Sequence, residues 1–123
     1  MDKAKKVLIV EDETLTAMAM EAYVEEKGHR VVGLSATGED AVRRAREEMP
    51  DLVLMDFRLA GKMDGMEAAR LIEAERPTAV AIISGYEERI VLEGRGGYAP
   101  AAYLSKPIDF ADIDVLLLAL DRP

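Results

Sequence analysis

The sequence predicts an α/β fold: a doubly wound, five-stranded parallel sheet with helices on both faces, of the flavodoxin-like (βα)5 type. Short apolar runs recur five times and alternate with stretches of helical period. These runs lack polar alternation, which is typical of strands buried on both faces of a parallel sheet. Right-handed crossovers leave few topologies for five such units, and the strand order 2-1-3-4-5 is the leading one.

Helix-capping and helix-breaking residues set the element boundaries in chain order. The first helix ends at Gly28, which suits the position just past a last turn. The second and third helices begin at the capping residues Thr37 and Asp64. They end before Pro50 and Pro77, respectively. We therefore expect strands at residues 7–10, 31–35, 52–55, 79–83 and 101–105, and helices at residues 13–27, 37–48, 65–76, 87–93 and 109–120.

The helices differ in the strength of their patterns. The helix expected over residues 87–93 is short and weak, because three glycines and Pro100 follow it closely. The last helix begins at the capping residue Asp109. The inward stripes of the first and last helices are expected to be Leu15, Met18, Ala19 and Ala22, and Ile113, Leu116, Leu117 and Leu120. Leu118 or Val115 falls outside the last stripe and is expected to be exposed, where it could form a partner or self-association surface.

Composition limits the class of protein. The chain has 123 residues, half of them hydrophobic and a third charged, which fits one domain over residues 1–123. It stops three residues after Leu120, so we expect no output domain. Without cysteine there is no disulfide or thiolate metal site. No apolar run is long enough for a membrane helix or a secretory signal, so we expect no membrane association and a cytoplasmic protein. A net charge of −8 disfavours direct binding of nucleic acid.

Polar side chains follow the strands of the predicted sheet. Glu11 and Asp12 follow the first strand, and Asp56 follows the third. Ser84 ends the fourth strand, and the fifth runs into Lys106. Ligands of open α/β sheets bind beyond the carboxyl ends of the strands, so we expect these five side chains to converge at one edge.

Three carboxylates at one edge call for a cation or shared protons. Two carboxylates about 4 Å apart repel by about 4 kcal/mol at an effective dielectric constant of about 20. The expected ligands are hard oxygens with room for water, which suits Mg²⁺; Ca²⁺ normally takes more ligands. Taken singly, Glu11 and Asp12 could simply open the next helix, where acids suit the dipole. Together with Asp56 and Lys106 they favour a functional site.

The same edge suits phosphoryl transfer. A carboxylate can act as a nucleophile and form an acyl phosphate, and Asp56 stands at the end of a buried central strand. Phosphoryl transfer needs positioning and charge neutralisation more than covalent machinery. Lys106 could supply a point charge to a phosphoryl oxygen and Ser84 a hydrogen bond. Singly, they could also be a surface lysine and a strand-end turn residue.

The residues in this order resemble the receiver domain of two-component response regulators, the chemotaxis-regulator-like fold. The matching segments are VLIVEDE, DLVLMD, AIISG and YLSKP, and the likeness covers essentially the whole chain. The resemblance implies that Asp56 accepts a phosphoryl group from a histidine kinase or a phosphotransfer protein. It implies a Mg²⁺ site formed by Glu11, Asp12, Asp56 and the backbone carbonyl of Arg58. It also implies a signalling domain that is not an enzyme and has no organic cofactor.

The resemblance further implies a conformational switch. The Ser84 hydroxyl would turn toward the phosphoryl group, the Tyr103 ring would turn inward, and Lys106 would pair with the phosphoryl group. The Lys106–Pro107 bond is expected to be cis. The surface formed by the fourth and fifth strands and helices would then regulate a separate partner protein. A homodimer through the fourth helix, fifth strand and fifth helix is a further expectation.

The loop after Asp56 departs from the family's common form. It reads FRLAGKMDG and is one residue longer, with Lys62 as the extra residue. Ala60 stands where the common form has a proline. The position of the Arg58 carbonyl is therefore the least constrained part of the expected site.

Two other functions compete with the switch. A small Mg²⁺-dependent phosphatase of the haloacid-dehalogenase type also uses an aspartate nucleophile after a strand, and forms an aspartyl phosphate. Such enzymes need a second acid two residues later, where this chain has Arg58. A flavodoxin-like cofactor binder needs a phosphate loop rich in Ser, Thr or Gly after the first strand, where Glu11, Asp12 and Glu13 would repel phosphate.

Overall fold

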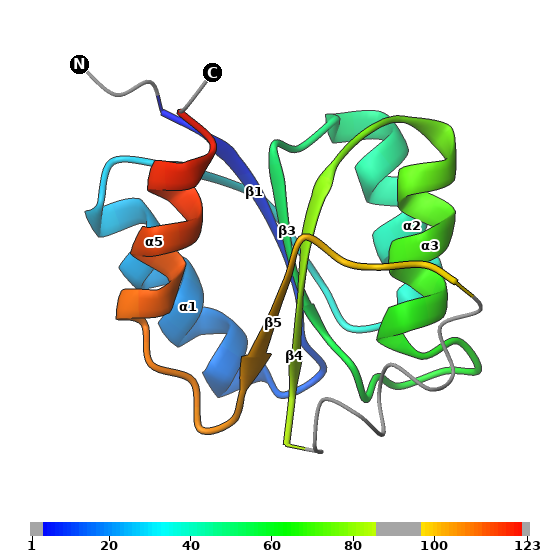
Figure 1. The fold of residues 1–123 in the computed structure, drawn as a ribbon. Helices are drawn as coiled ribbons and strands as arrows, with labels where there is room; N and C mark the ends of the chain where they lie inside the picture. The colour runs from blue at the N-terminus through cyan, green and yellow to red at the C-terminus, as the bar shows by residue number, and fades with distance from the viewer. Residues whose placement is uncertain (1–3, 86–96, 122–123) are drawn as a thin grey trace.

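The computed structural model describes residues 4–85 and 97–121, and its strands form one parallel sheet in the order β2-β1-β3-β4-β5 (Figure 1). This confirms the predicted fold class and strand order. The expected helix over residues 87–93 lies outside the described residues. The strands are β1 (Lys6–Val10), β2 (Arg30–Ser35), β3 (Leu52–Asp56), β4 (Ala79–Ser84) and β5 (Ala102–Ser105). The described helices are α1 (Thr14–Glu26), α2 (Gly38–Glu48), α3 (Gly65–Glu75) and α5 (Ala111–Ala119).

The sheet lies between two helical layers. Figure 1 shows α1 and α5 on one side of it and α2 and α3 on the other. Neighbouring residues of β1 serve opposite layers: Leu8 packs in the cluster with α2 and α3, and Ile9 in the cluster with α1 and α5. Burial on both faces explains why the strand segments show no polar alternation.

Side chains cap the helices close to the expected positions. The Thr37 hydroxyl accepts a hydrogen bond from Asp40 N at 3.0 Å, and the Asp64 carboxylate accepts one from Glu67 N at 2.8 Å. Each bond satisfies a backbone N–H that the first turn of a helix leaves without a partner. In α5 the cap position belongs to Phe110, one residue later than expected, and Asp109 accepts from Ala111 N.

The predicted inward stripe of α1 is wrong. Leu15 is 78% exposed and Met18 52% exposed, and the two alanines of the stripe are exposed as well. The buried residues are Ala17, Met20 and Val24. Apolar residues occur on nearly every face of this segment, so the 3.6-residue period fits two different stripes. Packing against the sheet selects the other one and leaves an apolar surface on α1.

The apolar run of α5 follows its prediction more closely. Ile113 and Leu117 are buried against the sheet, and Leu116 and Leu120 pack partly buried at the edge of the same cluster. Both residues expected to fall outside the stripe are exposed: Val115 and Leu118. Within the described part of the chain, no helix combines the length and apolar character needed to cross a membrane.

Candidate acidic site at the carboxyl edge of the sheet

Backbone hydrogen bonds fix the residues that follow the strands. Glu11 N donates to Ser35 O at 2.8 Å, which carries the β1–β2 pairing one residue past β1. Lys106 N donates to Ser84 O at 2.8 Å, which does the same beyond β5. Asp56 ends β3 and pairs in register with Ile83. The side chains at this edge therefore project from anchored backbone.

The three acids expected to share a cation are brought together. Glu11, Asp12 and Asp56 each offer a carboxylate oxygen, and these oxygens all lie within 4.8 Å of one another. Glu11 is 6% exposed and Asp56 is 4% exposed, while Asp12 faces solvent. Lys106 Nζ lies 3.0 Å from Asp56 Oδ1 and 3.9 Å from Glu11 Oε1. The fold therefore brings these four residues together, as the sequence predicted.

Burial and mutual charge change the protonation of this group. Burial, with the nearby Asp56 charge, raises the pKa of Glu11 to about 7, although the Glu13 backbone N–H donates to Glu11 Oε2 at 3.0 Å and opposes the rise. Burial lowers the pKa of Lys106, but its hydrogen bond to Asp56 and the acidic charges around it outweigh that effect and raise it. The edge therefore holds more negative charge than Lys106 neutralises.

These residues fit a hard divalent cation. The potential ligands are carboxylate oxygens from two adjacent strand ends, close enough to share one ion. Burial, with the nearby Asp56 charge, raises the pKa of Glu11, so this carboxyl holds its proton more tightly than an isolated one does. A bound divalent ion would favour the ionised form of this buried carboxyl.

A hollow opens directly over the acids. Its volume is about 540 Å³, which leaves space for a phosphoryl group and water. Arg58 lines it, as does Pro107, whose peptide bond with Lys106 is cis. The full lining is Glu11, Asp12, Glu13, Thr16, Asp56, Arg58, Lys106, Pro107 and Ile108. Sequence reasoning did not include Thr16, which hydrogen-bonds Glu13 at the start of α1.

The two residues expected to form the switch lie in β4 and β5. Ser84 is buried at the end of β4 and pairs in register with Ser105, the residue before Lys106. Tyr103 is partly buried and packs against the core cluster on the α2 and α3 side. The backbone bond from Lys106 to Ser84 places the serine beside the acidic site. Tyr103 pairs with Ile82, two residues earlier in each strand and so farther from the site.

Gly65 is a site residue that sequence reasoning missed. It is the first residue of α3, and its N–H donates to Phe57 O at 2.8 Å. A Cβ atom added at Gly65 would lie 2.1 Å from the backbone oxygen of Asp56. The only sequence signal is a glycine directly after the capping residue Asp64. Its meaning depends on a close approach that the local pattern does not reveal.

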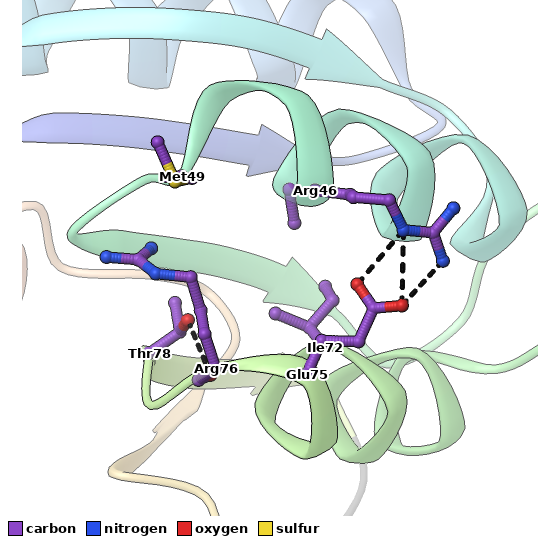
Figure 2. A pocket seen from close by; sticks show the side chains of 7 residues that line it. Arg46, Met49, Ile72, Glu75, Arg76 and Thr78 are labelled. Atoms are coloured by element: carbon purple, nitrogen blue, oxygen red, sulfur yellow. Dashed lines mark hydrogen bonds and ion pairs between the residues drawn. The ribbon is translucent and has the colours of Figure 1, made fainter.

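A second hollow lies between α2 and α3, and none of the expected site residues lines it (Figure 2). Its volume is about 210 Å³. Arg46 of α2 pairs with Glu75 of α3 across it, with a shortest distance of 2.6 Å. Arg76 donates to Pro50 O at 3.1 Å, beside the exposed Met49 that ends α2 in a left-handed conformation. These contacts tie the two helices together at their carboxyl ends.

Comparison with known sequences places this geometry in a family. The family model of the response regulator receiver domain matches residues 7–117. The chain is 34% identical over 119 residues to the transcriptional regulatory protein PdtaR of Mycobacterium tuberculosis, covering 96% of this chain and 58% of PdtaR. It is 36% identical over 117 residues to the phyllosphere-induced regulator PhyR of Methylorubrum extorquens, covering 94% of this chain and 43% of PhyR. The chain thus spans about half the length of these curated relatives.

Solved structures agree. The receiver domain of PhyR from Erythrobacter litoralis superposes with a TM-score of 0.83 at 30% identity, covering 98% of this chain and 95% of that one. The signal receiver domain of a modulated diguanylate cyclase from Desulfovibrio desulfuricans gives a TM-score of 0.84 at 31% identity, covering 96% and 93%. Similarity therefore extends over both the sequence and the fold.

Proposed function

Because this chain belongs to the response regulator receiver domain family, we propose that it is a phosphoryl-accepting switch of two-component signalling, phosphorylated on Asp56. The observation that carries the proposal is the grouping of Glu11, Asp12 and Asp56 with Lys106 Nζ 3.0 Å from the expected acceptor. This arrangement combines a fixed carboxylate nucleophile with positive charge for the phosphoryl oxygens.

In the proposed reaction, a carboxylate oxygen of Asp56 attacks the phosphorus of a phosphohistidine on a histidine kinase or phosphotransfer protein. A P–O bond forms and the P–N bond breaks, and its electron pair stays on the departing imidazole nitrogen. The Lys106 ammonium then turns from the Asp56 carboxylate to a phosphoryl oxygen, and the Ser84 hydroxyl donates to another. Asp56 becomes an acyl phosphate and no proton is needed for the bond exchange itself.

Glu11, Asp12, Asp56 and the backbone carbonyl of Arg58 would hold Mg²⁺. When bound, the ion supplies positive charge that offsets the charge of the carboxylates and of the incoming phosphoryl group. Burial raises the pKa of Glu11, so this carboxyl must lose its proton before it can bind the ion.

The acyl phosphate carries about 1.5–2 negative charges at the edge of the sheet, where the Asp56 carboxylate carried one. We propose that Ser84 and Tyr103 convert this local change into a different surface over β4, β5 and α5. That surface would regulate a downstream protein partner or a second copy of the chain. The exposed Val115 and Leu118 on α5 support such a contact.

An amide NMR titration tests the function. Addition of Mg²⁺ to the ¹⁵N-labelled protein should shift the amide signals of residues 11–13 and 56–58. Addition of beryllofluoride, a phosphoryl mimic, should then produce further shifts around Ser84 and Tyr103. A titration in which Mg²⁺ leaves these signals unchanged at millimolar concentration would contradict the proposal. Steady turnover of a free phosphomonoester would instead favour the phosphatase interpretation.

Mg²⁺ binding should depend on pH through Glu11. Its pKa of about 7, against a usual value near 4.5, means that this carboxyl is protonated at pH 6 and ionised at pH 8 in the metal-free protein. Because Mg²⁺ must displace that proton, the apparent affinity should rise about tenfold from pH 6 to pH 8. Calorimetric titration at several pH values measures this. Glu11→Gln should bind Mg²⁺ more weakly and show little pH dependence over the same range.

The raised pKa of Glu11 also affects the stability of the metal-free protein. The folded protein holds the Glu11 proton more tightly than the unfolded chain does, so this contribution to stability is full below about pH 4.5 and is lost as the pH rises through about 7. Mg²⁺ should therefore raise the melting temperature more at pH 8 than at pH 6. An equal rise at both values would contradict the assignment of Glu11.

A further inference from the structure

We propose that the first turn of α2 positions the Arg58 backbone, with Gly38 and Met63 as positioning residues that set how tightly the acidic site binds Mg²⁺. The inference rests on the function proposed above, in which the Arg58 carbonyl is a metal ligand. It adds a dependence of that ligand on a helix that contributes no residue to the lining of the site.

The loop after Asp56 is anchored first at Phe57. Phe57 N donates to Ile83 O of β4 at 2.9 Å, and Phe57 O accepts from Gly65 N of α3 at 2.8 Å. Both backbone polar groups of Phe57 are thus used, one toward the sheet and one toward a helix. The residue that precedes Arg58 therefore has little freedom to move.

The second anchor lies on α2. Ala60 forms a parallel backbone bridge with Thr37, the residue that also caps α2. Arg58 and Leu59 span the two anchors, and Leu59 packs against the core cluster of α2 and α3. The direction of the Arg58 carbonyl is therefore set by where Thr37 holds Ala60.

Close packing reinforces the second anchor. A Cβ atom at Gly38 would lie 3.1 Å from Cβ, Cγ and Sδ of Met63, so the first turn of α2 leaves no free space against the loop. Gly61 has φ +92°, a conformation that favours glycine, and its missing Cβ would lie 3.0 Å from Glu39 Oε1. The chain can bring the loop this close to α2 because both contact positions are glycine.

The residues on both sides of Lys62 lie against the first turn of α2: Gly61 against Glu39, and Met63 against Gly38. At the other end of α2, the Arg46–Glu75 ion pair holds the helix against α3 (Figure 2). Because Ala41 and Ala45 bury α2 in the core cluster, a crowded contact at Gly38 is expected to move the loop rather than the helix.

Gly38→Ala tests the inference with Mg²⁺ as the only ligand. The added methyl group should displace Met63 and, through the loop, the Arg58 carbonyl. Residues that orient metal ligands typically change metal affinity by tenfold or more, so we expect Mg²⁺ affinity to fall about tenfold in calorimetric titration. The melting temperature in EDTA should stay close to that of the parent, because alanine is a better helix former than glycine and compensates for the crowding. A merely structural role would lower stability without this selective loss of affinity.

A second variant and a control complete the design. Met63→Ala removes Cγ and Sδ, two of the three Met63 atoms that the new methyl group would meet, and leaves only Cβ. The double variant Gly38→Ala/Met63→Ala should therefore bind Mg²⁺ within about threefold of Met63→Ala alone. Arg46→Ala disturbs the far end of the same helix, and because its ion pair is exposed it should change Mg²⁺ affinity by less than about twofold.

The outcomes separate this inference from the proposed function. If the parent protein binds Mg²⁺ and Gly38→Ala binds it equally well, the positioning role is wrong while the function stands. If the parent binds no Mg²⁺, both are wrong. If Gly38→Ala does not fold, the double variant decides: it should fold and bind Mg²⁺, and a folded double variant without affinity would overturn the inference.

Discussion

Asp56→Asn should take up no phosphate when the protein is incubated with Mg²⁺ and a small phosphodonor such as acetyl phosphate or phosphoramidate. Asparagine has nearly the same shape, but its amide is too weak a nucleophile to form the acyl phosphate. Intact-mass spectrometry after a short incubation measures the phosphorylated fraction directly. The parent should show a phosphorylated species under the same conditions.

A matched control lies at the other end of β3. Asp51 is exposed and accepts a hydrogen bond from Lys6 N at 2.8 Å, far from the acidic site, and an asparagine there can still accept. Asp51→Asn should therefore be phosphorylated like the parent. Uptake by Asp56→Asn equal to that of Asp51→Asn would show that another residue accepts the phosphoryl group, and the proposed role of Asp56 would be wrong.

The sheet and the grouping of the acids could be predicted because both follow from short-range rules. Strands buried on both faces need continuous apolar segments, and the carboxyl ends of parallel strands meet at one edge. Because residues 52–55 are predicted to form a buried strand, Asp56, which follows them, must lie near the residues that follow the first strand. The capping residues Thr37 and Asp64 bond to backbone groups three residues later, so the local sequence is enough to predict where these two helices begin.

The features that could not be predicted from the sequence depend on tertiary packing. The segment of α1 is apolar on several faces, and only contact with the sheet selects Met20 and Val24 over Leu15 and Met18. The pKa of Glu11 depends on its burial and its distance from Asp56, neither of which is local. The bridge between Thr37 and the loop joins residues far apart in the chain, so no periodicity or cap could reveal it.

Gly65→Ala should lower the free energy of unfolding far more than Gly38→Ala does. A Cβ at this position would lie 2.1 Å from the backbone oxygen of Asp56 and 2.9 Å from Phe57 Cα. These are backbone atoms of a central strand and its anchored loop, so no side chain can rotate to make room. We expect a loss of about 3 kcal/mol or more in the free energy of unfolding, at the upper end for overpacked interiors.

Gly85→Ala is the matched control, because a Cβ there meets no atom of the described residues within 4 Å. Its free energy of unfolding should stay within about 0.5 kcal/mol of the parent in urea titrations. Elsewhere in a helix, glycine to alanine is expected to stabilise, so a loss at Gly65 cannot arise from helix propensity. It must come from the close approach of α3 to Asp56, the proposed phosphoryl acceptor. If Gly65→Ala is as stable as Gly85→Ala, α3 does not pack against Asp56 this closely, and the backbone on which the acidic site is built is arranged differently.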